Sequence, residues 1–201
     1  MKVISYPLGQ LQANCYFLIK KEECLLIDPG DDADFILGKI QQADLHLVGV
    51  MATHGHFDHV MAVGEIQESF DVPLYISKKD TFLLRRTKKS SEFFLGFSVP
   101  VLPIKKIKNL NIENWKLKII ETPGHTPGSV CYYFPEEKVI FTGDTLFKDG
   151  IGRYDFSYSS KNDLVNSLKK ILKLPEETIV YPGHGAKTTI LEEKDILTTI
   201  Y

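Results

Sequence analysis

Five of the six histidines in this 201-residue chain lie in three short, glycine-containing segments. These are residues 53–59, 123–129 and 181–185, and each comes directly after a strand-like run. A fourth segment of the same kind, residues 141–145, carries Asp144 instead of a histidine. Polar residues that repeatedly follow strands favour an α/β fold in which several strand ends supply one site.

Short runs rich in β-forming residues, separated by polar or glycine turns, predict the strands. Apolar residues at helical spacing predict the helices. We expect strands at residues 3–6, 13–19, 24–27, 45–52, 74–76, 117–120, 129–134, 139–142 and 178–181, with a hairpin around residues 135–138. We expect helices after residue 31, from near Val60, after a cap at Ser159 or Ser160, and at residues 191–201. The order resembles two βα halves placed end to end.

The length favours one substantial core, so residues 1–201 are predicted to form a single domain. The formal net charge of −2 gives no general attraction for nucleic acid. We see no signal peptide and no membrane-length apolar run. The three cysteines lie in apolar, strand-like segments and are predicted to be buried free thiols, which fits a cytoplasmic location. The oligomeric state stays open.

Residues 78–115 are the hardest part of the sequence to interpret. They contain four basic residues between positions 85 and 89, followed by an aromatic stretch at residues 93–97. One interpretation is a solvated helix followed by core aromatic residues. The other is a lip over the active site or a dimer contact.

Imidazole and carboxylate groups are ligands that suit zinc, iron and manganese. Seven candidates exceed the four ligands of one tetrahedral site: His54, His56, Asp58, His59, His125, Asp144 and His184. Taken singly, His125, Asp144 and His184 could each be a turn residue, and Asp58 could be a helix cap. Together they predict two adjacent ions with Asp144 as a bridge and a shared water.

Local geometry supports the first motif as a ligand segment. In an extended loop His54, His56 and Asp58 would alternate onto one side, while His59 would point elsewhere. A helix beginning near Val60 would place its positive end beside Asp58 and favour the ionised carboxylate.

These motifs, in this order, resemble the metallo-β-lactamase superfamily over nearly the whole chain. The resemblance implies an αββα fold, in which two mixed sheets lie between outer helices. It implies that His54, His56 and His125 hold one metal. It also implies that Asp58, His59 and His184 hold the second, that Asp144 bridges them, and that Asp28 supports the metal loop.

Within the superfamily, residues 123–129, 141–147 and 150–156 look most like glyoxalase II-like hydrolases, here in a short form without the C-terminal helical domain. The branch of true β-lactamases generally has cysteine where Asp144 stands, which disfavours antibiotic hydrolysis. Arg153 matches a glutathione-binding lysine and is a candidate substrate anchor, together with Tyr154. Asp155 replaces a tyrosine of the family pattern, so glutathione specificity is not implied. An ion pair with Asp155 is the alternative role for Arg153.

The leading hypothesis is a dinuclear metal hydrolase that cleaves a small thioester or related acyl compound through a metal-bridging hydroxide. Its metals would be two divalent ions, with zinc favoured over iron or manganese. The alternative is a mononuclear iron persulfide dioxygenase that uses His54, His125 and Asp144. A metal-binding scaffold without activity is a third hypothesis, which replacement of Asp58 would test.

Overall fold

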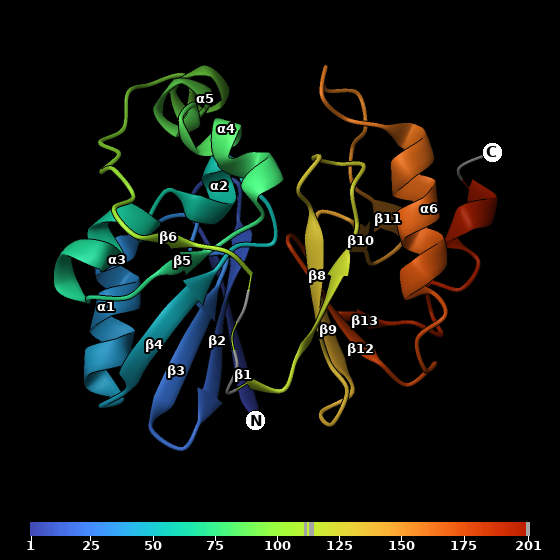
Figure 1. Ribbon diagram of the computed structural model, residues 1–201, viewed down its shortest axis with the longest axis horizontal. Coiled ribbons are helices and arrows are strands. Elements are labelled where there is room, and N and C mark those ends of the chain that lie inside the picture. Colours follow the sequence, from blue (N-terminus) through green and yellow to red (C-terminus); the bar gives the residue numbers. More distant parts are fainter. Residues whose placement is uncertain (111, 113–114, 200–201) are drawn as a thin grey trace. The chain divides into compact units, whose positions relative to one another are not determined.

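A computed structural model describes residues 1–110, 112 and 115–199. The chain divides by its internal contacts into two compact units, Met1–Asn111 and Ile112–Tyr201. Each unit contains one main sheet and its own helices, and Figure 1 labels them. The two units correspond to the two βα halves expected from the sequence. The single domain over residues 1–201 stays a prediction.

The first unit has a six-stranded sheet in the order β1-β2-β3-β4-β5-β6. Its strands are β1 (Lys2–Leu8), β2 (Ala13–Lys20), β3 (Glu23–Ile27), β4 (His46–Met51), β5 (Leu74–Tyr75) and β6 (Ile107–Lys108). The first three strands are antiparallel, and β3 to β6 are parallel. Parallel neighbours need crossover connections, which here contain the helices.

Helix α1 (Ala33–Gln42) connects β3 to β4, and α2 (Phe57–Val60) and α3 (Val63–Ser69) connect β4 to β5. Figure 1 shows α1 and α3 together on one face of this sheet. Buried apolar side chains of α1 and α3, such as Ile36 and Ile66, form one core with Phe17 and Leu26 of the strands. Between β5 and β6 lie the 3₁₀ turn η1 (Lys78–Asp80), α4 (Thr81–Leu84) and α5 (Thr87–Leu95).

The second unit has a five-stranded mixed sheet in the order β13-β12-β9-β8-β7. Its strands are β7 (Lys118–Glu121), β8 (Val130–Phe134), β9 (Val139–Gly143), β12 (Ile179–Pro182) and β13 (Thr188–Thr189). A small hairpin of β10 (Leu146–Phe147) and β11 (Gly150–Ile151) follows β9. Helix α6 (Lys161–Ile171) buries Leu164, Leu168 and Ile171 against this sheet's core.

Three predictions differ from the structure. The helix expected from near Val60 begins at Phe57, and Met61 and Ala62 separate α2 from α3. The aromatic residues expected in a core are exposed, with Phe93 79% and Phe94 and Phe97 each 47% accessible. The closing helix is only a short 3₁₀ turn, η3 (Ile196–Thr199), and residues 200–201 of that prediction lie outside the described residues. Among the described residues, no helix combines the length and apolar character needed to cross a membrane.

Candidate metal centre

The first unit presents its functional side chains at one edge of its sheet. Strands β3, β4 and β5 are parallel, so their carboxyl ends lie at the same edge. Asp28 follows β3, the histidine motif at residues 53–59 follows β4, and Asp80 lies shortly after β5. Topology therefore brings together residues that are about 25 positions apart in the sequence.

Asp28 is a fully buried carboxylate that organises the motif. Its Oδ1 accepts the backbone N–H of Thr53 at 2.7 Å, and its Oδ2 accepts the Thr53 hydroxyl at 2.6 Å. The same Oδ2 lies 3.0 Å from Nδ1 of His59, so Nδ1 carries a proton and in the neutral ring Nε2 has the lone pair. A carboxylate that fixes a ligand histidine in this way is a common support for a metal site.

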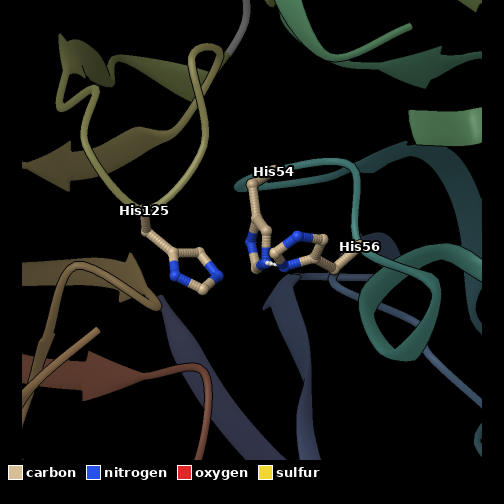
Figure 2. Close-up of side chains that lie close together, drawn as sticks. All are labelled: His54, His56 and His125. Carbon is tan, nitrogen blue, oxygen red and sulfur yellow. Dashed lines mark hydrogen bonds between the residues drawn. The ribbon is translucent and has the colours of Figure 1, made fainter. Parts of the chain in front are cut away.

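His54 and His56 form a pair whose ring nitrogens face each other (Figure 2). Nδ1 of His54 lies 3.1 Å from the Thr53 hydroxyl, whose own proton is donated to Asp28. Nδ1 of His54 is therefore the donor, and its Nε2 lone pair lies 3.0 Å from Nδ1 of His56. Either a proton or a cation must lie between these two nitrogens. Two nitrogen ligands on one metal are separated by about 2.9–3.4 Å, given metal–nitrogen bonds of about 2.0–2.1 Å.

Asp58 and His59 form a second pair in the same unit. Oδ2 of Asp58 lies 3.7 Å from Nε2 of His59, close to the separation of two ligands of one ion. The predicted alternation of residues 54, 56 and 58 on an extended loop is wrong beyond His56. That residue is the N-cap of α2, so Asp58 lies on a helical turn beside His59. The helical turn separates the pair His54 and His56 from the pair Asp58 and His59.

The second unit also gathers its candidate ligands at one edge. Strand β7 is antiparallel to β8, and β8 is antiparallel to β9, so β7 runs in the same direction as β9. Strand β12 is parallel to β9. His125, Asp144 and His184 follow β7, β9 and β12 respectively, at the carboxyl ends of these three strands.

Asp144 lies between the two histidines of this unit. Its Oδ2 is 3.5 Å from Nε2 of His125, and its Oδ1 is 3.8 Å from Nε2 of His184. The side chain of Asp144 is 13% exposed and that of His125 is 3% exposed. One carboxylate thus offers a different oxygen to each histidine, which is the arrangement that a bridging ligand needs.

The loop around His125 is held by contacts within the second unit. Nδ1 of His125 lies 2.8 Å from the carbonyl oxygen of Arg153, which can only accept, so Nδ1 carries a proton and in the neutral ring Nε2 has the lone pair. The hydroxyl of Ser159 donates to the carbonyl of His125 at 2.7 Å. The described donor set therefore fits divalent metals: His54, His59 and His125 all direct an Nε2 lone pair away from a fixed Nδ1.

The predicted substrate residues lie on the same loop. The guanidinium of Arg153 donates from two nitrogens to the two carboxylate oxygens of Asp155, at 2.7 and 2.8 Å. This bidentate pairing raises the pKa of Arg153 and lowers that of Asp155. It matches the ion pair that the sequence left open as the alternative role for Arg153. Tyr154 is 38% exposed and carries the ammonium group of Lys161 over its ring at 5.6 Å.

Three supporting residues were not predicted from the sequence. They are Thr53, which orients His54, Ser159, which holds the His125 carbonyl, and Asp80, which accepts the N–H of Gly55 at 2.9 Å. The position of Thr53 directly before the first candidate ligand, His54, was the one local signal available. Asp80 and Ser159 act on residues 25 and 34 positions away, and such contacts leave no pattern in a single sequence.

Residues 8–184 match the family model described as the metallo-beta-lactamase superfamily. The probable metallo-hydrolase YqgX of Bacillus subtilis is 38% identical, over 97% of this chain and 95% of that protein. The hydroxyacylglutathione hydrolase GloC of Haemophilus influenzae is 35% identical, over 96% and 95%.

Two solved structures show the same fold. TTHA1623 in a di-iron-bound form has a TM-score of 0.89 at 37% identity, covering 95% of this chain and 96% of that one. The BLEG-1 B3 metallo-beta-lactamase has a TM-score of 0.88 at 36% identity, covering 96% and 97%. These similarities confirm the predicted αββα class, and the chain belongs to the metallo-β-lactamase superfamily.

Proposed function

We propose that this protein is a dinuclear metal-dependent hydrolase of a small thioester or related acyl compound. In this proposal His54, His56 and His125 hold one divalent ion, Asp58, His59 and His184 hold the other, and Asp144 bridges them. Zinc is the favoured metal. Iron and manganese are the alternatives, because imidazole and carboxylate ligands suit all three. The three buried free cysteines fit a reducing, cytoplasmic location.

The observation that carries the proposal is the placement of Asp144 between two histidines. Its two oxygens face His125 and His184 separately. The first unit likewise offers two distinct pairs, His54 with His56 and Asp58 with His59. Two pairs and a bridging carboxylate offer more ligands than one tetrahedral ion takes, which supports two ions over one.

When bound, two divalent ions supply a water whose pKa is lowered to about 7 and a Lewis acid for a carbonyl oxygen. The protein contributes orientation and a proton acceptor. Asp58 is the candidate acceptor, because its carboxylate is 16% exposed and lies beside His59 in the ligand loop. Asp28 and Thr53 keep His54 and His59 in the tautomer that directs Nε2 outward.

The proposed substrate class rests on the relatives and on the loop after β11. The GloC relative is named as a hydrolase of hydroxyacylglutathione, a thioester. Arg153 and Tyr154 are candidate substrate contacts, although a substrate carboxylate would have to displace Asp155 from the guanidinium of Arg153. Because Arg153 is engaged in this way, we expect thioesters without a glutathione group to be accepted as well.

Metal content and substrate turnover test the proposal together. We expect about two ions per chain by elemental mass spectrometry and hydrolysis within a panel of thioesters, lactones and β-lactams. Asp58→Ala should lower kcat by about 10²–10⁴-fold, the usual contribution of a general base. Asp34→Ala is the matched control, since Asp34 is also a first-turn helical acid. Full activity in Asp58→Ala would contradict the assigned role.

A second candidate is the mononuclear iron persulfide dioxygenase, with His54, His125 and Asp144 on iron. The di-iron-bound form of TTHA1623 makes iron a metal to test, because a protein 37% identical to this chain binds iron, in that case as two ions. Two histidines and one carboxylate are a known arrangement for oxygen activation. About one iron per chain and oxygen uptake with glutathione persulfide would favour this candidate over the hydrolase.

A further inference from the structure

Asp80 occupies the N-cap position of α4, where an aspartate side chain commonly accepts a hydrogen bond from the first turn. Its side chain makes no such capping bond. Oδ2 of Asp80 instead accepts the backbone N–H of Gly55 at 2.9 Å, and the residue is fully buried. Burying a carboxylate costs free energy unless a specific partner compensates for the lost water. The placement of Asp80 beside Gly55 therefore calls for a structural or functional explanation.

Gly55 lies between His54 and His56, the two residues whose ring nitrogens are 3.0 Å apart. The N–H of Thr53 is bound by Asp28 and the N–H of Gly55 is bound by Asp80. Two buried carboxylates therefore hold alternate N–H groups of one short segment. Asp28 was expected in this role, whereas Asp80 comes from a different crossover connection.

Gly55 also packs closely against the turn that contains Asp80 and against Leu83 of α4. A Cβ at this position would lie 2.9 Å from the carbonyl oxygen of Asp80 and 3.0 Å from Cβ of Leu83. The histidine segment therefore packs directly against the turn that begins α4. The hydrogen bond from Gly55 fixes the distance between the two segments. Movement of either segment would change the separation of the His54 and His56 rings.

We propose that Asp80 is a positioning residue that sets the His54 and His56 pair for the first metal ion. The inference rests on the proposed function, because it assumes that these histidines are ligands. Loss of Asp80 releases the Gly55 N–H and lets the two rings move apart. Outer partners of metal ligands typically contribute about 10–100-fold to metal affinity.

Zinc affinity of the full chain, measured by competition with a chromogenic chelator, tests this inference. We expect Asp80→Ala to weaken the binding of one zinc ion per chain about 10–100-fold. Asp80→Asn keeps an oxygen that accepts the Gly55 N–H and should restore most of the affinity. If Asp80→Ala does not fold, Asp80→Ser, whose hydroxyl is one bond shorter, takes its place in the comparison.

Glu193→Ala is the matched control. Glu193 is also a buried acid that accepts a backbone N–H, from Asp149 at 3.1 Å, and it lies outside the ligand segments. It should lower the melting temperature and leave zinc affinity unchanged. Wild-type affinity in Asp80→Ala, or an equal loss in Glu193→Ala, would overturn the inference. Zinc binding that depends on Asp80 without any acyl hydrolysis would instead overturn only the proposed function. A wild type that binds no zinc, iron or manganese would overturn both.

Discussion

Asp144 is the residue through which the proposed centre is most directly tested. Its oxygens face His125 and His184, so an amide in its place would present one acceptor and one donor. We expect Asp144→Asn to reduce metal content from about two ions per chain to about one or fewer. Asp155 is an exposed acid eleven positions further along the chain and pairs with Arg153. The control variant Asp155→Asn should keep the wild-type metal content. Two ions retained in Asp144→Asn would argue against a bridge.

The cysteines lead to a second prediction at this scale. Burial raises the pKa of Cys24 and of Cys131 to about 12, and burial also raises that of Cys15. The thiolate is the reactive form, so at pH 8 only about one thiol in 10⁴ would be ionised. We expect no reaction of the native protein with Ellman's reagent, and reaction of all three thiols after unfolding in guanidinium. Rapid labelling of the native protein would contradict the buried assignment.

Many residues of the candidate site could be identified from the sequence, because ligand chemistry restricts which side chains can serve. Histidine and aspartate after strand ends indicated His54, Asp144 and their partners. Supporting residues such as Asp80 could not be predicted, since aspartate near a helix start is ordinarily a cap. Which N–H a carboxylate accepts depends on how the crossover connections pack, and that is a property of the tertiary structure.

At the scale of elements, Gly152 shows how closely the loop after β11 packs against Asp144, a proposed ligand. A Cβ at position 152 would lie 1.7 Å from the carbonyl oxygen of Asp144. We expect Gly152→Ala to cost about 1–3 kcal/mol of stability, measured by denaturant unfolding, because well-packed backbone must move. It should also lower metal content by displacing Asp144. Gly150→Ala is the control, since its nearest atoms would be 3.8 Å away, and equal effects of both changes would contradict this explanation.

The two serines before α6 have different roles and predict different outcomes. Ser160 accepts the N–H of Asp163 as the N-cap, whereas Ser159 donates to the carbonyl of His125. Ser160→Ala should therefore cost about 1 kcal/mol of stability and leave zinc affinity unchanged. Ser159→Ala should lower zinc affinity with a smaller loss of stability. Chelator competition and denaturant unfolding of both variants would separate the roles, and identical behaviour would contradict them.

Most elements were predictable because strand and helix periodicities are local properties. Strand β2 begins at Ala13, as predicted, and α6 has the predicted apolar stripe. The start of α2 was missed because residues 53–59 are mostly polar candidate ligands and carry no apolar periodicity. The aromatic stretch was misassigned because composition alone cannot show which face a short helix such as α5 turns to solvent.

At the scale of the whole molecule, the proposed ligands come from both compact units. The first unit contributes His54, His56, Asp58 and His59, and the second contributes the other three, among them Asp144. Each unit has its own sheet and its own buried core. Metal binding is therefore expected to contribute to the stability of the entire chain, rather than to one loop.

Removal of metal tests this coupling. A ligand at a thousandfold excess over its dissociation constant stabilises a folded protein by about 4 kcal/mol. For a chain of this length, 1 kcal/mol corresponds to about 2–4 °C, so the apo-protein should melt about 8–16 °C below the metal-loaded form. Calorimetry before and after chelation measures the difference, and returning zinc should restore it. Asp144→Asn should show a much smaller shift, because its bridge is lost. Equal melting temperatures for the apo and loaded wild type would mean that metal binding does not stabilise the folded chain.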